Sequence, residues 1–415
     1  MQCRGRAMKT KLSLDSSFLQ PTISEVFAST PIQNNFIFST IFIQIMRKTT
    51  GGARPKKKMY HRVHELDKVM DFQKKPSLIL QLKSIILNQK TQSILVRDLE
   101  KEVGFVKKWD FMAVIEKYPS IFHVSGGDGN KTPILVKLTE KAAKIAAEEG
   151  DVRQVMEPII VNKLRKLLMM SIDCRVPLEK IEFIRSELGL MRDFKECLIP
   201  KYPEFFTVID VNGFPYLNLE IWDSSIAVTA REEKLVAVSS TLEGDVTNFG
   251  GDHKKVKISK DGNFSGPFAF EMNFPVSFRP NMKYLEEVQK WQKMPFPSPY
   301  LSARRFEPAD PKARKRAVAV LHEVLSLTME KRLNSAQLDA FHAEYQLPVK
   351  LLLCLVKHHG IFYMTNKGAK STVLLKDAYN GINLIEKCPL LRFNDKFVGL
   401  GCKRDDNAGK KIPLS

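Results

Sequence analysis

The chain contains Lys117-Tyr-Pro-Ser-Ile-Phe122 and repeats it as Lys201-Tyr-Pro-Glu-Phe-Phe206. A weaker third copy reads Lys357-His-His-Gly-Ile-Phe-Tyr363. Internal similarity of this kind indicates a chain built from repeated structural units. The residues on either side of each copy should therefore form the same elements in the same order.

A pair of helices is predicted before each copy. In the first copy, Leu95, Leu99 and Val103 are spaced four residues apart, as on one face of a helix. Gly104 should end this helix because glycine adopts the left-handed conformation easily, and a second helix should run to Lys117. Proline or glycine then stops the second helix. The first-helix positions of the other copies are Ile181, Ile184 and Leu188, and Leu338, Phe341 and Tyr345.

A β-hairpin is predicted after each pair of helices. The pair Asn212-Gly213, for example, is favoured in tight hairpin turns. The expected strands are 121–124 with 134–138, 205–211 with 216–219, and 361–364 with 372–375. The sequence therefore predicts an α+β, helix-rich fold of repeated helix-helix-β-hairpin units, at about 94–142, 177–223 and 334–380, with connecting helices.

The segments between the units differ in character. Residues 137–172 read as a helix, whereas 243–278 alternate polar and aromatic residues and read as an irregular insertion. Residues 295–311 form a proline-rich connector into the third unit. A basic arm is expected at 51–74 and a frayed basic tail at 394–415.

Charge gives the main functional signal. The chain has 65 Lys and Arg against 46 Asp and Glu, a net charge of +19, which favours nucleic acid or an anionic membrane as partner. Basic runs would give an RNA affinity that falls with salt, although a solvated helix face is the alternative. The candidate RNA contacts in these runs are Arg54, Lys56, Lys57, Lys58, Lys107, Lys108, Lys163, Arg165, Lys166, Arg304, Arg305, Lys312, Arg314, Lys315 and Arg316.

The repeated Lys-Tyr pairs are further candidates. Lys117 and Lys201 could contact phosphates, and Tyr118 and Tyr202 could stack on unpaired bases. Aromatic residues at such a corner can equally close the core of their unit. We favour a core role for the neighbouring Phe122 and Phe206, and leave both roles open for the tyrosines.

The sequence gives little support for catalysis or metal binding. Its six cysteines include no C-x-x-C pair, and 126–132 lacks the glycine spacing of a phosphate-binding loop. Cys354-x-x-x-His358-His359 and His61-x-x-His64 each lack a second ligand pair at a suitable distance. We therefore expect no enzyme activity, metal, cofactor or small-molecule substrate. No apolar run reaches the roughly 18–20 residues that span a bilayer.

The beginning of the chain resembles an organelle transit peptide. Residues 1–58 hold ten Lys or Arg and two acids, with frequent Ser and Thr. A secretory signal would place its apolar core earlier than 36–46. We expect a transit peptide at 1–50, and the mixture of basic and bulky residues favours the mitochondrion over the chloroplast.

Several stretches in one order resemble the plant organelle RNA recognition domain family, which includes the What's-this-factor splicing proteins. Besides the Lys-Tyr-Pro copies, they are Phe274-Pro-Val-Ser-Phe278 and the segments 288–300, 316–328 and 359–363. The resemblance covers the region from about Lys75 to about Leu391, so that we set the RNA-binding region at 75–393. Gly360 stands where the family has proline, which should leave the helix stop intact.

This resemblance implies a function that composition alone does not. It implies an RNA-binding protein that promotes splicing of group II introns in mitochondria or plastids, with intron RNA and other splicing factors as partners. Two alternatives stay open at this point: a protein-binding scaffold in an organellar ribonucleoprotein complex, and an organellar nuclease.

Overall fold

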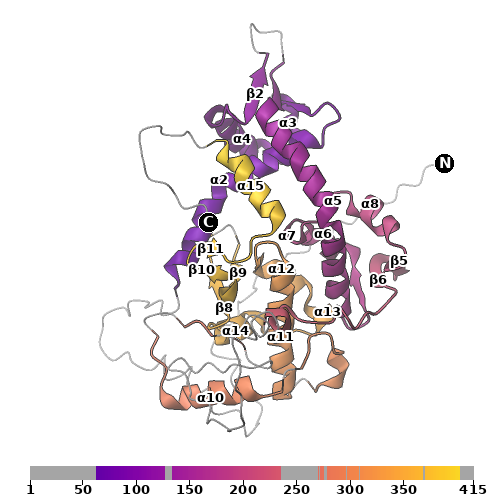
Figure 1. Cartoon of the computed structure of the whole chain (residues 1–415), viewed down its shortest axis with the longest axis vertical. Helices are drawn as coiled ribbons and strands as arrows, with labels where there is room; N and C mark the ends of the chain where they lie inside the picture. Colours follow the sequence, from indigo (N-terminus) through magenta and orange to yellow (C-terminus); the bar gives the residue numbers. More distant parts are fainter. Residues whose placement is uncertain are drawn as a thin grey trace, which may run out of the picture. The chain divides into compact units, whose positions relative to one another are not determined.

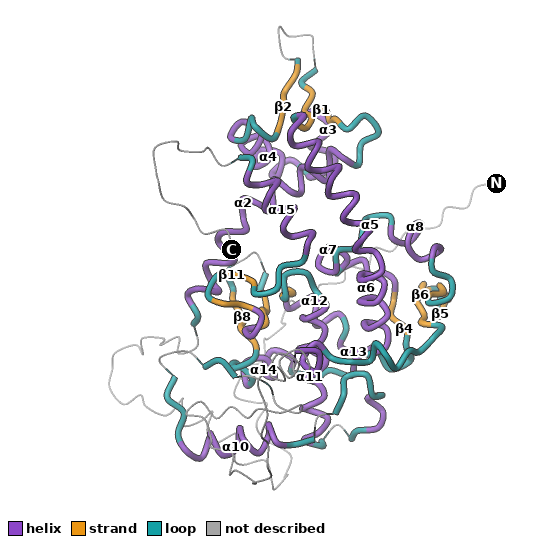
Figure 2. The backbone as a smooth tube through the Cα atoms, in the orientation of Figure 1, coloured by secondary structure: helices purple, strands orange, loops and turns teal. Residues whose placement is uncertain are grey.

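The computed structural model describes residues 62–126, 133–234, 270, 272–274, 278–295, 297–307, 309–367 and 370–401 (Figure 1). Every described residue belongs to one compact unit, residues 60–415. The predicted transit peptide, and part of the predicted basic arm, lie outside the described residues. Figure 2 shows many helices and short strands, so the α+β, helix-rich fold class is confirmed.

Three antiparallel sheets of the same order are found within the described residues. In each, a short strand precedes the helices and pairs with the second strand of the hairpin, which becomes the middle strand. The hairpin strands begin and end within two residues of the predicted positions, but the short first strand was not expected from the sequence. The sheets are β1 (Ser93–Leu95), β3 (Leu135–Leu138) and β2 (Phe122–Ser125); β4 (Arg175–Pro177), β6 (Phe214–Leu219) and β5 (Phe206–Val211); and β7 (Arg332–Asn334), β9 (Thr372–Leu375) and β8 (Phe362–Thr365).

The helices between the first strand and the hairpin also recur. The first sheet has α3 (Val96–Val103) and α4 (Phe105–Lys117). In the second and third sheets the first helix is broken near Ile184 and Phe341, where the backbone leaves the helical region. The resulting helices are α6 (Leu178–Phe183), α7 (Arg185–Leu188) and α8 (Phe194–Lys201), and α12 (Ser335–Ala340), α13 (His342–Tyr345) and α14 (Leu351–Lys357).

One backbone feature is common to all three sheets. The residue just before the first strand is left-handed in each, with φ of 48° at Gln92, 53° at Cys174 and 52° at Lys331. Few residues other than glycine adopt this conformation. Its recurrence at equivalent positions indicates that the same tight turn feeds each sheet.

Longer helices connect these elements. Helix α5 (Glu140–Met169) is capped by Thr139, whose side chain accepts a hydrogen bond from Ala142 N. The helix contacts the first two sheets and α11. The remaining elements are α2 (His64–Leu87), α10 (Met282–Lys293), η3 (Ala303–Arg305), α11 (Pro311–Leu327), η4 (Lys376–Ala378), the short strands β10 (Tyr379–Asn380) and β11 (Asn383–Leu384), and α15 (Pro389–Gly399).

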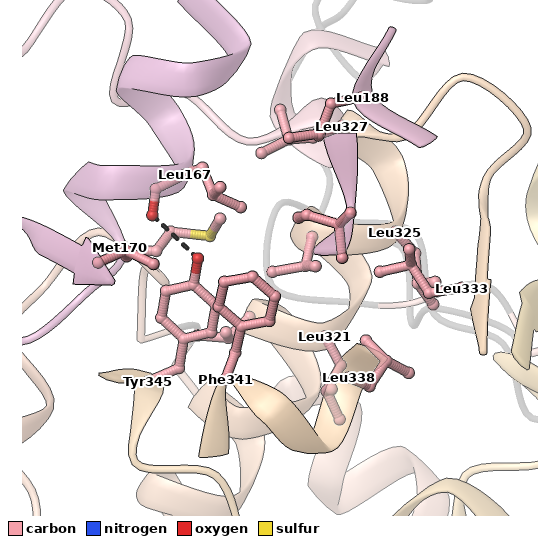
Figure 3. Close-up of a cluster of buried hydrophobic side chains, with 14 of the residues drawn as sticks. Leu167, Met170, Leu188, Leu321, Leu325, Leu327, Leu333, Leu338, Phe341 and Tyr345 are labelled. Atoms are coloured by element: carbon pink, nitrogen blue, oxygen red, sulfur yellow. Dashed lines mark hydrogen bonds between the residues drawn. The ribbon is translucent and has the colours of Figure 1, made fainter. Parts of the chain in front are cut away.

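Two large apolar clusters hold the fold together. The first lies among α2, α4, the first sheet and α15. The second unites α5 and α11 with the second and third sheets, and part of it is drawn in Figure 3. There Phe341 and Tyr345 stack with ring centroids 5.4 Å apart, and the Tyr345 hydroxyl donates to the Leu167 carbonyl over 3.1 Å.

Apolar residues are buried in the predicted basic arm, the predicted insertion and the predicted tail. Phe397, in the predicted tail, is fully buried on α15, and Leu66 and Val69, in the predicted arm, are buried on α2. Phe270 and Met272, near the end of the predicted insertion, are also buried. Phe397 belongs to the first cluster, and Phe270 and Met272 belong to the second. Leu66 forms a small separate cluster with Tyr363 and Leu374. The bounds of the arm, the insertion and the tail stay a prediction.

Candidate nucleic-acid interface

The basic run at 304–316 divides into an exposed and a buried part. Arg304 and Arg305 are exposed on η3, and Lys312 and Arg314 are exposed at the start of α11. Asp310 caps α11 by accepting a hydrogen bond from Lys312 N over 2.8 Å. We call these four cationic residues the α11 basic surface.

The other two residues of the run are buried. The Lys315 ammonium group donates to the carbonyls of Trp291, Gln292 and Met294, at 2.6–2.9 Å. These carbonyls belong to the last turn of α10 and the residue beyond it, where helix carbonyls lack partners within the helix. Lys315 therefore fastens the end of α10 to α11.

Arg316 plays a similar part on the next position of α11. Its guanidinium donates to the carbonyls of Leu301 at 3.0 Å, Pro299 at 3.1 Å and Tyr345 at 3.2 Å. Burial lowers the pKa of Lys315 to about 8 and that of Arg316 to about 10. Backbone carbonyls thus occupy both cations inside the protein, and contact of Lys315 or Arg316 with RNA stays a prediction.

The basic group on α5 is also largely engaged within the protein. The buried Arg165 guanidinium lies 4.1 Å from the centre of the Phe205 ring and pairs with Asp223 over 3.1 Å. Lys166 donates to Glu233 over 2.8 Å, and burial lowers the pKa of Lys163. Arg165 and Lys166 therefore hold the segment after the second sheet against α5. Contact of these residues with RNA stays a prediction.

The two Lys-Tyr pairs differ in their surroundings. Lys117 is exposed at the end of α4, and Tyr118 is half-buried against the first core. In the second pair, Lys201 and the Tyr202 hydroxyl both bind the Glu157 carboxylate at 2.6 Å. These hydrogen bonds lower the pKa of Glu157.

The aromatic residues beside these pairs have a clearer role. Phe122 and Phe206 are each 2% exposed, so the core role favoured for them is confirmed. Tyr202 stacks on Phe205 with ring centroids 6.2 Å apart. Both tyrosines thus lie at the edge of their units with part of each ring covered.

The remaining candidates are placed less fully. Lys107 and Lys108 belong to α4, and Arg54, Lys56, Lys57 and Lys58 lie outside the described residues. Among the residues that the structure describes, no group of three or more His, Cys, Asp or Glu is arranged to hold a metal ion. None of the helices in this part of the chain combines the length and apolar composition of a membrane span.

Sequence reasoning missed Asp173, which links Arg304 of the α11 basic surface to Arg175 in the second sheet. Its carboxylate pairs with Arg304 over 2.8 Å and accepts a hydrogen bond from Arg175 over 3.4 Å. An acid two residues before an arginine recurs as Glu330 and Arg332 at the third sheet. This recurrence was a signal in the sequence that could have located the residues.

Comparison with known proteins identifies the family. The model of the plant organelle RNA recognition domain matches residues 61–405. The chloroplastic WHAT'S THIS FACTOR 1 homolog of Arabidopsis thaliana is 28% identical, over 98% of this chain and 77% of its own length. ROOT PRIMORDIUM DEFECTIVE 1 from the same plant is 31% identical, over 80% of each chain.

A further relative is named for the other organelle. The mitochondrial WHAT'S THIS FACTOR 9 of Arabidopsis thaliana is 25% identical, over 78% of each chain. No solved structure matches the chain. Because the family model covers most of the sequence, the chain belongs to the plant organelle RNA recognition domain family, which gives it an organellar, RNA-related function.

Proposed function

We propose that this protein binds group II intron RNA in a plant organelle and promotes its splicing. The observation that carries the proposal is the α11 basic surface, whose four cations are exposed on a chain of this family. Arginine and lysine side chains neutralise backbone phosphates and release counterions. Higher affinity for the folded intron than for its misfolded forms would shift the RNA toward the splicing-competent state.

The local structure supports phosphate contact at Arg304 and Arg305. Arg316 binds the carbonyls of Pro299 and Leu301, a few residues before both arginines. These hydrogen bonds hold in place the backbone that leads to Arg304 and Arg305. Arg304 pairs with Asp173 at the surface. An exposed pair of this kind is weak, and a phosphate can therefore compete for the arginine.

Binding of a group II intron fragment across a salt series tests the proposal. The wild-type affinity should fall steeply as salt rises. In a plot of the logarithm of the association constant against the logarithm of the salt concentration, the slope should be about −0.7 for each phosphate contact to single-stranded RNA. Arg304→Glu/Arg305→Glu should weaken binding and make the slope shallower. The matched control is Arg97→Glu/Lys101→Glu, which reverses two exposed charges on α3 and should change binding less.

Two outcomes would contradict this function. Wild-type affinity that does not depend on salt would exclude a phosphate-based interface. Unchanged intron splicing in organelles that carry only the Arg304→Glu/Arg305→Glu protein would favour a scaffold that binds other proteins of the splicing complex. A loss of splicing with normal protein levels is the expected result.

We infer that the protein acts without breaking bonds in RNA. Incubation of the purified chain with end-labelled intron RNA and Mg²⁺ should leave the RNA intact. Cleavage activity that remains with the chain through further purification would instead support a nuclease.

We also propose the mitochondrion as the compartment, from the basic and bulky composition of 1–50. Relatives named for both organelles are known, so composition is the only basis for this choice. Import of the labelled chain into isolated mitochondria, with chloroplasts as the parallel sample, tests it. Import into chloroplasts alone would overturn it.

A further inference from the structure

The outer face of the β4-β6-β5 sheet carries aromatic and basic residues. Successive residues of a strand point to opposite faces, and Val176 and Leu217 are fully buried on the inner face. Tyr216 and Ile209 are opposite each other on the outer face, where both are half-buried. Phe214 follows on the same face at the end of the hairpin, with 62% of its surface exposed.

This face continues into the α11 basic surface. The Arg175 guanidinium lies 5.7 Å from the centre of the Tyr216 ring, which places a cation beside the aromatic residue. Asp173 then connects Arg175 to Arg304 through the two contacts described above. Aromatic rings and exposed basic residues are therefore neighbours on one surface.

The corresponding faces of the other two sheets carry no aromatic residue at the position of Tyr216. By register, the position of Tyr216 is occupied by Leu135 in the first sheet and by Thr372 in the third. Thr372 is buried, whereas Tyr216 is not. Of the three sheets, it is thus the second that has an aromatic residue at this position and leaves it partly exposed.

We propose that this outer face stacks unpaired bases of single-stranded RNA while Arg304 and Arg305 contact the phosphates. Aromatic side chains bind unpaired bases through stacking, and a neighbouring cation strengthens the contact. Glu220 accepts hydrogen bonds from Thr207 and Asn218 on the same sheet. Its negative charge disfavours phosphate there and directs the phosphates toward η3. The inference rests on the proposed function and names the part of the RNA that this surface binds.

Binding of a labelled ten-nucleotide single-stranded RNA to the full chain tests the inference. Phe214→Ala should weaken binding about tenfold, as expected for the loss of one stacked base, and Tyr216→Ala should do the same. Tyr216→Phe keeps the ring and should retain wild-type affinity. The matched control is Phe72→Ala on α2, because Phe72 is 64% exposed and should leave affinity unchanged.

The salt dependence separates this inference from the proposed function. Stacking variants should lower affinity without changing the salt slope, whereas Arg304→Glu/Arg305→Glu should reduce the slope. Wild-type protein that binds no RNA would overturn the proposed function. Wild-type protein that binds RNA as tightly as the Phe214→Ala and Tyr216→Ala variants would overturn the stacking site alone. Phe214 is exposed, so its variant is expected to fold.

Discussion

The outer faces of the second and third sheets share a backbone arrangement but have opposite surroundings. Arg175 and Arg332 occupy the same register position, and each pairs with an acid two residues earlier. In the third sheet, Leu374 and Tyr363 on that face are buried, at 0% and 6% exposed. In the second sheet the face stays open.

Helix α2 accounts for the difference. Leu66 packs against Tyr363 and Leu374, and Asp67 accepts hydrogen bonds from the hydroxyls of Tyr363 at 2.8 Å and Thr365 at 2.7 Å. The same kind of sheet face therefore docks a helix in one place and stays open in another. Function is better sought on the face that the protein does not itself cover.

Removing the carboxylate that docks α2 should have the largest effect on stability. Asp67→Ala leaves two buried hydroxyls without their acceptor and should lower the free energy of unfolding by about 3 kcal/mol. Chemical denaturation measures it. Asp71→Ala is the control, because Asp71 forms an exposed pair with Lys367 that is worth less than about 1 kcal/mol. Equal losses in both variants would show that α2 is not held by Asp67.

Removing one tyrosine hydroxyl from each sheet should give an effect of intermediate size on stability, and the effect should differ between the covered and the open face. Tyr363→Phe takes a hydrogen bond from the buried Asp67 and should lower the free energy of unfolding by about 1–2 kcal/mol. Tyr216→Phe should change it by less than about 0.5 kcal/mol, because its side chain lies at the surface. A comparable loss from Tyr216→Phe would mean that the second sheet is also covered.

The smallest expected effect is a change in the stability contributed by Asp67 at acidic pH. Burial would raise the pKa of Asp67, but the hydrogen bonds it accepts outweigh burial and lower it below its usual 3.8. The folded state then binds fewer protons than the unfolded state, so this stabilisation is present above about pH 4 and is lost as pH falls further. The difference in stability between wild type and Asp67→Asn should shrink below pH 4. A difference that stays constant would contradict a lowered pKa.

The hairpins and the fold class were predictable because their signals are local. A turn such as Asn212-Gly213 and the alternation on either side of it fix two strands within a few residues. The strands β1, β4 and β7 are three residues long, too short for alternation to reveal. The unit boundaries themselves stay a prediction.

The candidate site was harder to predict because charge does not reveal burial. Arg314 and Lys315 are neighbours in one basic run, yet one is exposed and the other buried. Lys315 is buried because it binds carbonyls at the end of α10, which lies outside the run. Tyr216 and Arg175 were missed for a related reason, since only the register of the short β4 brings them together.

The buried Arg316 has a consequence for the entropy of RNA binding. Its guanidinium bonds hold Pro299 and Leu301, a few residues before Arg304 and Arg305. A backbone that is ordered before the ligand arrives loses less conformational freedom on binding. A buried cation thereby preorganises the two exposed cations that are proposed to contact RNA.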